Sequence, residues 1–232
     1  EITTRLVGSE MCIRDRFYRT FDGNNHTISG LYYDNSDSTG KMIGLFGYIN
    51  GGTVKNVGVI DSYINGLEFI GGISGYMLKG SITNCYFKGT AIANAYIGGI
   101  CGLNSDTISN CYSMASIRGG EYTGGIAGRV YEKDNVNCYY LSNTDDGQGG
   151  KTAAQFASGE VAYLLAQGEN GTVWGQTIGE DSYPQLRGAV VYQNGSVYAN
   201  GAAKLEGTSL SLNGTIGVHF YVSLSDVVTE DA

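Results

Sequence analysis

The sequence predicts an all-β fold, a right-handed parallel β-helix (solenoid) of about five coils. Three observations lead to this prediction. A glycine-rich motif recurs every 26 to 28 residues, the chain has 37 glycines but a single proline, and apolar residues alternate at a period of two between glycine and asparagine turns. This period is too short for the usual two-helix repeats, so each repeat should form one coil of short strands that stacks in parallel on the next at about 4.8 Å.

Each repeat carries two markers, and these define the predicted core. The first is Gly-Gly-Ile-x-Gly or a close variant, and the second, eight or nine residues later, is Ile-x-Asn-Cys or a variant. Stacking in register turns equivalent residues into ladders. The first inward ladder is predicted to contain Leu45, Ile73, Ile100 and Ile126. The second is predicted to contain Val54, Ile82, Ile108 and Val136. The asparagines of the second marker are suited to left-handed backbone at corners: Asn56, Asn84 and Asn110.

Cys85, Cys111 and Cys138 recur at one position of the repeat, where Val57 also stands. They either pack in the core as small hydrophobic residues or form a metal or redox site. A ladder holds thiols in a line, whereas a metal needs them to converge on a point. Packing is therefore the favoured interpretation, and we expect no cofactor.

Tyr86, Tyr112 and Tyr139 follow these cysteines and are expected to point the opposite way, as an aromatic strip on one outer face. Aromatic pairs on neighbouring strands add about 0.2 to 1 kcal/mol each, which favours a structural role. Aromatic strips also bind sugars, so these tyrosines are the candidate ligand-binding residues.

The combined pattern, Gly-Gly-Ile-x-Gly followed by Ile-x-Asn-Cys-Tyr, resembles the GLUG-motif repeat of bacterial surface and secreted proteins. The resemblance extends from about Phe21 to Tyr140. It implies a β-helical stalk or display module of large exported proteins, among them adhesins and some IgA-degrading metallopeptidases. Peptidase activity does not carry over, because the sequence has no His-Glu-x-x-His zinc motif and its histidines are His26 and His219.

The first segment, 1–16, has no relation to the repeats and resembles a translated sequencing adapter. We expect it to be foreign to the native protein, so that the native start, with any export signal, is missing. The alternative is an ordinary polar strand. The solenoid is then expected over 17–150.

A helical cap is predicted over 151–188, after the repeats end. Thr152 to Gln155 matches a capping box, apolar residues follow at helical spacing, and Gly159 is expected to divide two short helices, with Ser158 capping the second. Such a cap would cover the open edge of the solenoid. Over 189–232, two hairpins with Asn-Gly turns predict the start of a β-sandwich-like domain that the chain does not complete.

Charge and motifs restrict the function. A net charge of −8 argues against nucleic acid as a partner, and no apolar run is long enough for a transmembrane segment. No paired catalytic carboxylates are recognisable, and Asn143 to Gly147 lacks the spacing of an EF-hand calcium loop. The leading hypothesis is a non-catalytic structural or display module of an exported bacterial surface protein, with host or cell-wall glycans or proteins as partners. The alternatives are a carbohydrate-binding module and an accessory fragment of a secreted peptidase or glycan-degrading enzyme.

Overall fold

The computed structural model describes residues 13–35, 40–166, 173–188, 191–194, 197–200, 204–211 and 217–223. It divides into two compact units, Glu1–Ala153 and Ala154–Ala232. Strands make up 61% of the structure and helices very little. No helix in the described ranges is long and apolar enough to cross a membrane.

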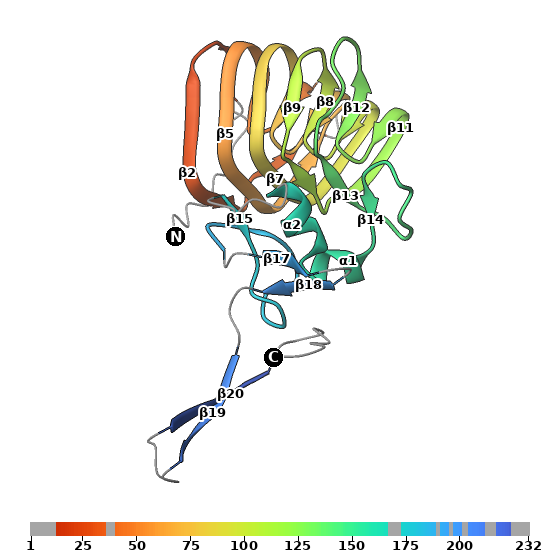
Figure 1. Ribbon diagram of the computed structural model, residues 1–232. Helices are drawn as coiled ribbons and strands as arrows, with labels where there is room; N and C mark the ends of the chain where they lie inside the picture. Colours follow the sequence, from red (N-terminus) through yellow and green to blue (C-terminus); the bar gives the residue numbers. More distant parts are fainter. Residues whose placement is uncertain are drawn as a thin grey trace. The chain divides into compact units, whose positions relative to one another are not determined.

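The first unit is a β-solenoid, which confirms the predicted fold class. Its strands pair in parallel throughout and form about four turns, seen side by side in Figure 1. The sequence predicted about five coils, so the observed number is slightly smaller. The strands are β1 (Ile13–Phe17), β2 (Thr20–Ser29), β3 (Tyr32–Asp34), β4 (Lys41–Ile43), β5 (Phe46–Asn65), β6 (Glu68–Gly71), β7 (Ser74–Gly98), β8 (Cys101–Asn104), β9 (Thr107–Ser109), β10 (Tyr112–Ser113), β11 (Ser116–Gly124), β12 (Ala127–Val130), β13 (Tyr139–Leu141) and β14 (Gly150–Lys151).

Strands β5 and β7 are the centre of the solenoid and each follows most of one coil. Their register aligns the repeats as the motifs suggest, with Val54 opposite Ile82 and Val57 opposite Cys85. The closing glycine of the first marker permits a tight corner here. A Cβ on Gly75 would lie 2.4 Å from the backbone of Met42 and Ile43, so only glycine allows this approach.

The two predicted core ladders are buried in the middle coils and less so at the ends. Ile73, Ile100, Val54, Ile82 and Ile108 are each 0% exposed, and Ile126 is 6% exposed. Two members differ from the prediction. Leu45 is only half-buried, because the preceding coil has no Gly-Gly-Ile corner to cover it. Val136 is 55% exposed, because it makes one isolated bridge, to Ser109, and has no strand on its other side among the described residues.

A polar ladder, separate from the two inward ladders, is formed by the asparagines at the corners of the coils. The left-handed backbone expected at three asparagines is observed, with φ of 56° at Asn56, 53° at Asn84 and 51° at Asn110, and Asn137 shares it with a φ of 51°. Their amides join successive coils. Asn84 Nδ2 donates to Asn56 Oδ1 at 3.0 Å, and Asn137 Nδ2 donates to Asn110 Oδ1 at 2.8 Å.

Asp22 ends this asparagine ladder at the first coil. Its Oδ1 accepts from Asn56 Nδ2 at 3.0 Å and from the Asn24 N–H at 2.9 Å, and its Oδ2 lies 3.2 Å from Lys55 Nζ. The hydrogen bond from Asn56 is the main reason that the pKa of Asp22 is lowered. The register places Asp22 opposite Lys55, and Asn25, with a φ of 62°, precedes His26 as Asn56 precedes Val57.

Most of the segment expected to be foreign lies outside the described residues. Its last four residues begin β1, which pairs in parallel with β5 and places Arg16 opposite Tyr48. This pairing corresponds to the alternative of a polar strand, while the origin of the segment stays a prediction.

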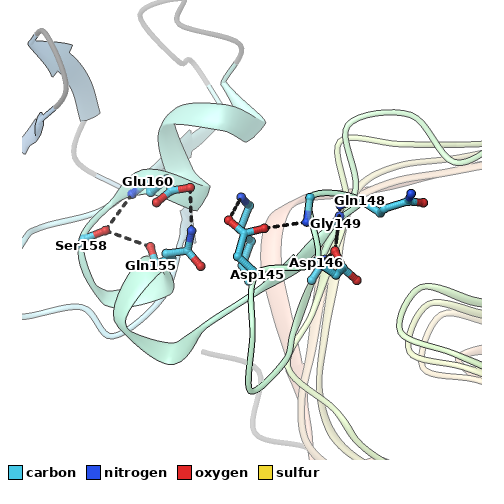
Figure 2. A network of polar contacts seen from close by, with 10 residues as sticks. Asp145, Asp146, Gln148, Gly149, Gln155, Ser158 and Glu160 are labelled. Atoms are coloured by element: carbon cyan, nitrogen blue, oxygen red, sulfur yellow. Dashed lines mark hydrogen bonds and ion pairs between the residues drawn. The ribbon is translucent and has the colours of Figure 1, made fainter.

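The second unit begins with two short helices, as predicted, α1 (Ala153–Ala157) and α2 (Glu160–Leu165). Gly159 separates them and takes the N-cap position of α2 with a φ of 87° and no side-chain cap. Ser158 instead lies in the turn: its Oγ donates to the Gln155 carbonyl at 3.1 Å and accepts from the Glu160 N–H at 3.4 Å (Figure 2).

Gln176 links the parts of this second unit and is 0% exposed. Its Nε2 donates to the carbonyls of Phe156 at 2.8 Å and Asp181 at 3.0 Å. Strand β15 (Trp174–Gly175) pairs antiparallel with β16 (Gln185–Leu186). The amide therefore ties the end of α1 to the turn before β16. That these elements cover an end of the solenoid stays a prediction.

Two antiparallel hairpins follow, in the places where the sequence predicts them. Strand β17 (Val191–Asn194) pairs with β18 (Val197–Asn200), and β19 (Lys204–Ser211) pairs with β20 (Gly217–Ser223). Each hairpin is a separate two-stranded sheet. The expected Asn213-Gly214 turn lies outside the described residues, and the sandwich-like domain stays a prediction.

Candidate functional site

The predicted tyrosine strip forms a ladder, but it is not the exposed surface we expected. Tyr112 lies opposite both Tyr86 and Tyr139 in the register, and the rings of Tyr86 and Tyr112 stack at 4.9 Å with an angle of 10°. Tyr86 is 1% exposed and Tyr112 is 0% exposed, while Tyr139 is half-buried. The prediction of an outer strip is therefore wrong for Tyr86 and Tyr112.

Gly58 explains part of this burial. It stands opposite Tyr86 in the register, and a Cβ on Gly58 would lie 2.2 Å from the Tyr86 ring. The Tyr86 ring thus lies over the glycine and does not project from the sheet. Because the faces of Tyr86 and Tyr112 are stacked and withdrawn from solvent, they offer no platform on which a sugar could stack.

The cysteine ladder is a line of buried thiols. Cys85 and Cys111 are 0% exposed and Cys138 is 9% exposed. Each thiol donates to the carbonyl two residues earlier, at 3.2, 3.1 and 3.3 Å respectively. Burial raises the pKa of Cys111 well above its usual value, which keeps this thiol protonated and unreactive. Across the described ranges, no three His, Cys, Asp or Glu side chains are grouped as a metal site would need.

The acidic loop after β13 is closed by its own backbone. Asp146 Oδ1 accepts from the N–H groups of Gln148 at 2.8 Å, Gly149 at 3.1 Å and Gly150 at 2.8 Å (Figure 2). The Tyr140 hydroxyl donates to Asp146 Oδ2. This bond from Tyr140, with the backbone N–H donors, lowers the pKa of Asp146 to about 2, and the same bond raises the pKa of Tyr140 to about 12. Donors thus surround the oxygens that a calcium ion would need.

A different aromatic strip reaches the surface, and the sequence analysis missed it. Its main part, the corner ladder, consists of Phe69, Tyr96 and Tyr122. Their rings stack in sequence, Phe69 on Tyr96 at 4.7 Å and Tyr96 on Tyr122 at 4.6 Å. All three have left-handed backbone, with φ of 59°, 53° and 55°. Such a conformation is strained for a bulky side chain, and it recurs here once per coil.

The signal for the corner ladder was present in the repeat. Each member stands two residues before the first glycine of a Gly-Gly motif, and Met42 occupies the equivalent place before Gly44 with a φ of 58°. Large side chains at a repeated position next to glycine would have identified the strip. Tyr76 extends it sideways, because its ring lies 6.0 Å from Phe69 and 5.1 Å from Tyr48.

The corner ladder ends at a cation held between two rings. The Arg129 guanidinium lies 4.6 Å from the centre of the Tyr122 ring and 4.5 Å from that of Tyr131. Arg129 belongs to β12 and is half-buried, Tyr122 belongs to β11 and is 37% exposed, and Tyr131 is 54% exposed. We call these three residues the Arg129 clamp. It is the candidate functional site of the solenoid.

No protein-family model matches the chain, and no curated protein matches it. Among solved structures, the chain is similar to the crystal structure of a candidate immunoglobulin A1 protease from Bacteroides ovatus. The TM-score is 0.42 and the identity 18%, over 72% of this chain and 76% of that one. A similarity this distant leaves the function of the chain to be inferred from its own residues.

Proposed function

We propose that the chain is a non-catalytic structural and display module of a larger exported bacterial surface protein. The observation that carries the proposal is the long parallel register of β5 and β7, which runs from Phe46 opposite Ser74 to Asn65 opposite Ile92. Coils paired along most of their length form a stiff element, because each coil is held by its neighbours. The resemblance of the repeats to GLUG motifs supports an exported setting.

The carboxylates of the solenoid support a structural role. A hydrolytic pair needs one carboxyl group free to donate a proton and another free to activate water. Here Asp22, Asp106 and Asp146 each accept a backbone N–H, and lysines pair with Asp22 and Asp106. A hydrogen bond from Asn56 is the main cause of the lowered pKa of Asp22, and one from Tyr140 is the main cause of the lowered pKa of Asp146. Both carboxyl groups are therefore charged at neutral pH. These acids stabilise turns and coil-to-coil contacts.

The display role is tested by measuring where the complete protein is located in the cell that produces it. Antibodies raised against the purified chain should label intact cells that carry the whole gene, without permeabilisation, and a cytosolic protein of the same cells serves as the control. Labelling that requires permeabilisation would overturn the proposal.

The alternative of an accessory fragment makes a separate expectation. In that case the complete gene would encode a catalytic domain, recognisable by a His-Glu-x-x-His motif or by paired carboxylates. Deletion of the solenoid should then change the rate at which the complete enzyme cleaves a large substrate, while cleavage of a small substrate stays the same. A pure display module would leave both rates unchanged.

A further inference from the structure

The Arg129 clamp differs from the other cationic sites of the solenoid. Four lysines form ion pairs with carboxylates: Lys41 with Glu68, Lys55 with Asp22, Lys133 with Asp106 and Lys151 with Asp145. The Arg129 guanidinium makes no hydrogen bond or ion pair in the part of the chain that the structure describes, and it lies over two tyrosine rings. Glu132 and Asp134 are the acids nearest to Arg129 in the sequence, and neither forms an ion pair with it among the described residues, while Glu121 is hydrogen-bonded to Tyr122.

The two rings near the Arg129 guanidinium restrict its movement, and the N–H groups of a guanidinium point outward in its own plane. These donors form a fork that matches a carboxylate with two parallel hydrogen bonds. Part of the water around the fork is displaced by Tyr122 and Tyr131, and this strengthens a charge-assisted bond relative to one made by an exposed arginine. The clamp is therefore prepared to bind an anion.

The charge of the solenoid does not oppose such a ligand. Over 13–151 the sequence has eleven Lys and Arg against twelve Asp and Glu, so most of the net −8 arises after residue 151. Because several of the solenoid's acids are paired with lysine or accept backbone N–H groups, Arg129 faces little competition within its own unit.

Tyr131 adds a second binding element beside the fork. Tyr131 is 54% exposed, and the contact with Arg129 is the only ring contact it makes among the described side chains. An exposed aromatic face packs against the C–H groups on the face of a sugar ring. A ring face next to a guanidinium fork matches a sugar that carries a carboxylate at its ring edge.

We propose that the Arg129 clamp binds a uronic acid residue of an acidic polysaccharide, with Arg129 on the carboxylate and Tyr131 on the sugar ring. The inference adds a ligand to the proposed display role but does not depend on it. A peptide is the less suitable occupant, because β12 is only four residues long and its edge can offer few main-chain hydrogen bonds to an added strand.

The test uses the full chain and polygalacturonate, with fully methyl-esterified polygalacturonate as the uncharged form of the same polymer. We expect binding to the free acid, and binding to the ester weaker by at least about tenfold, since charge-assisted hydrogen bonds are lost. Arg129→Gln should weaken binding to the acid by a similar factor. Arg129→Lys should recover only part of it, because lysine keeps the charge and loses the fork.

Arg118 provides the matched control. It is exposed on β11 and makes no ring or carboxylate contact with the residues that the structure describes. Arg118→Gln removes the same charge and should leave the affinity unchanged. Tyr131→Ala should weaken binding to both polymers, because both retain the sugar ring. Thermal unfolding of each variant verifies that the solenoid remains folded.

Three outcomes would overturn the inference. One is the absence of polygalacturonate binding by the unaltered chain. Another is an equal loss in Arg118→Gln and Arg129→Gln, which would indicate general electrostatic attraction. The third is equally strong binding of polyglutamate, which would assign the clamp to acidic peptides. Any of these results leaves the display role untouched, because cell-surface labelling is measured independently.

Discussion

The middle coils and the last coil of the solenoid carry the same motifs but are not equally buried. In β7 and the segments beside it, Ile82, Cys85 and Ile108 are 0% exposed. In the last coil, the equivalent Cys138 is 9% exposed and Val136 is 55% exposed. Backbone conformation stays the same, with φ of 53° at Asn84 and 51° at Asn137. The comparison teaches that a repeat encodes its own conformation, whereas burial depends on a coil being present on both sides.

The largest expected effect comes from shortening a side chain of the second inward ladder, and we compare a middle coil with the last coil. Ile82→Ala should lower the free energy of unfolding by about 2 to 5 kcal/mol, because it opens a cavity between coils. Val136→Ala should change it by no more than about 0.5 kcal/mol, because the side chain is largely in water. Urea unfolding measures both. Similar losses would mean that the last coil is as well packed as the centre.

A smaller effect is expected from the asparagine ladder. Asn84→Ala should cost about 2 kcal/mol, because alanine is strained in left-handed backbone and the amide bond to Asn56 is lost. Asn84→Gly relieves the strain and should cost about 1 kcal/mol, the part that belongs to the amide. Equal costs for the two variants, measured by urea unfolding, would show that the left-handed conformation contributes nothing.

The smallest effect concerns the Asp146 loop beyond the last coil, and it depends on pH. The pKa of Asp146 is lowered to about 2 in the folded chain, so its stabilisation is present above the unfolded pKa near 3.9 and is lost as the pH falls towards 2. The unfolding temperature of Asp146→Asn should therefore lie below that of the unaltered chain at pH 6, and the difference should shrink between pH 4 and 2. A difference that is constant over this range would rule out the charge as its cause.

The fold class was predictable because its evidence is local and repeated. Gly-Gly-Ile at a constant spacing identifies the corner of each coil, and the period of two places Val54, Ile82 and Ile108 on the inside. Asn56, Asn84 and Asn110 were predictable in the same way, since the tolerance of asparagine for left-handed backbone is a property of the residue itself.

The sequence analysis chose the wrong tyrosines, because the burial of a side chain depends on contacts between coils. The burial of Tyr86 depends on Gly58, 28 positions earlier in the chain and on another strand. The members of the Arg129 clamp lie close together in the sequence, on β11 and at the end of β12, but the pattern of the repeat gives no sign that their side chains meet. Alternation predicts which side of a strand a residue faces, but not what lies over it.

Asp22 has a consequence for how such a chain changes in length. Asn56 gives one hydrogen bond to Asp22 in the coil before it and receives one from Asn84 in the coil after it, so an extra copy inserted between β5 and β7 would keep both kinds of bond. A charged carboxylate can only receive. An added coil would therefore continue the chain of amide bonds between Asn56 and Asn84, whereas the carboxylate of Asp22 has no proton to give to a coil placed before it.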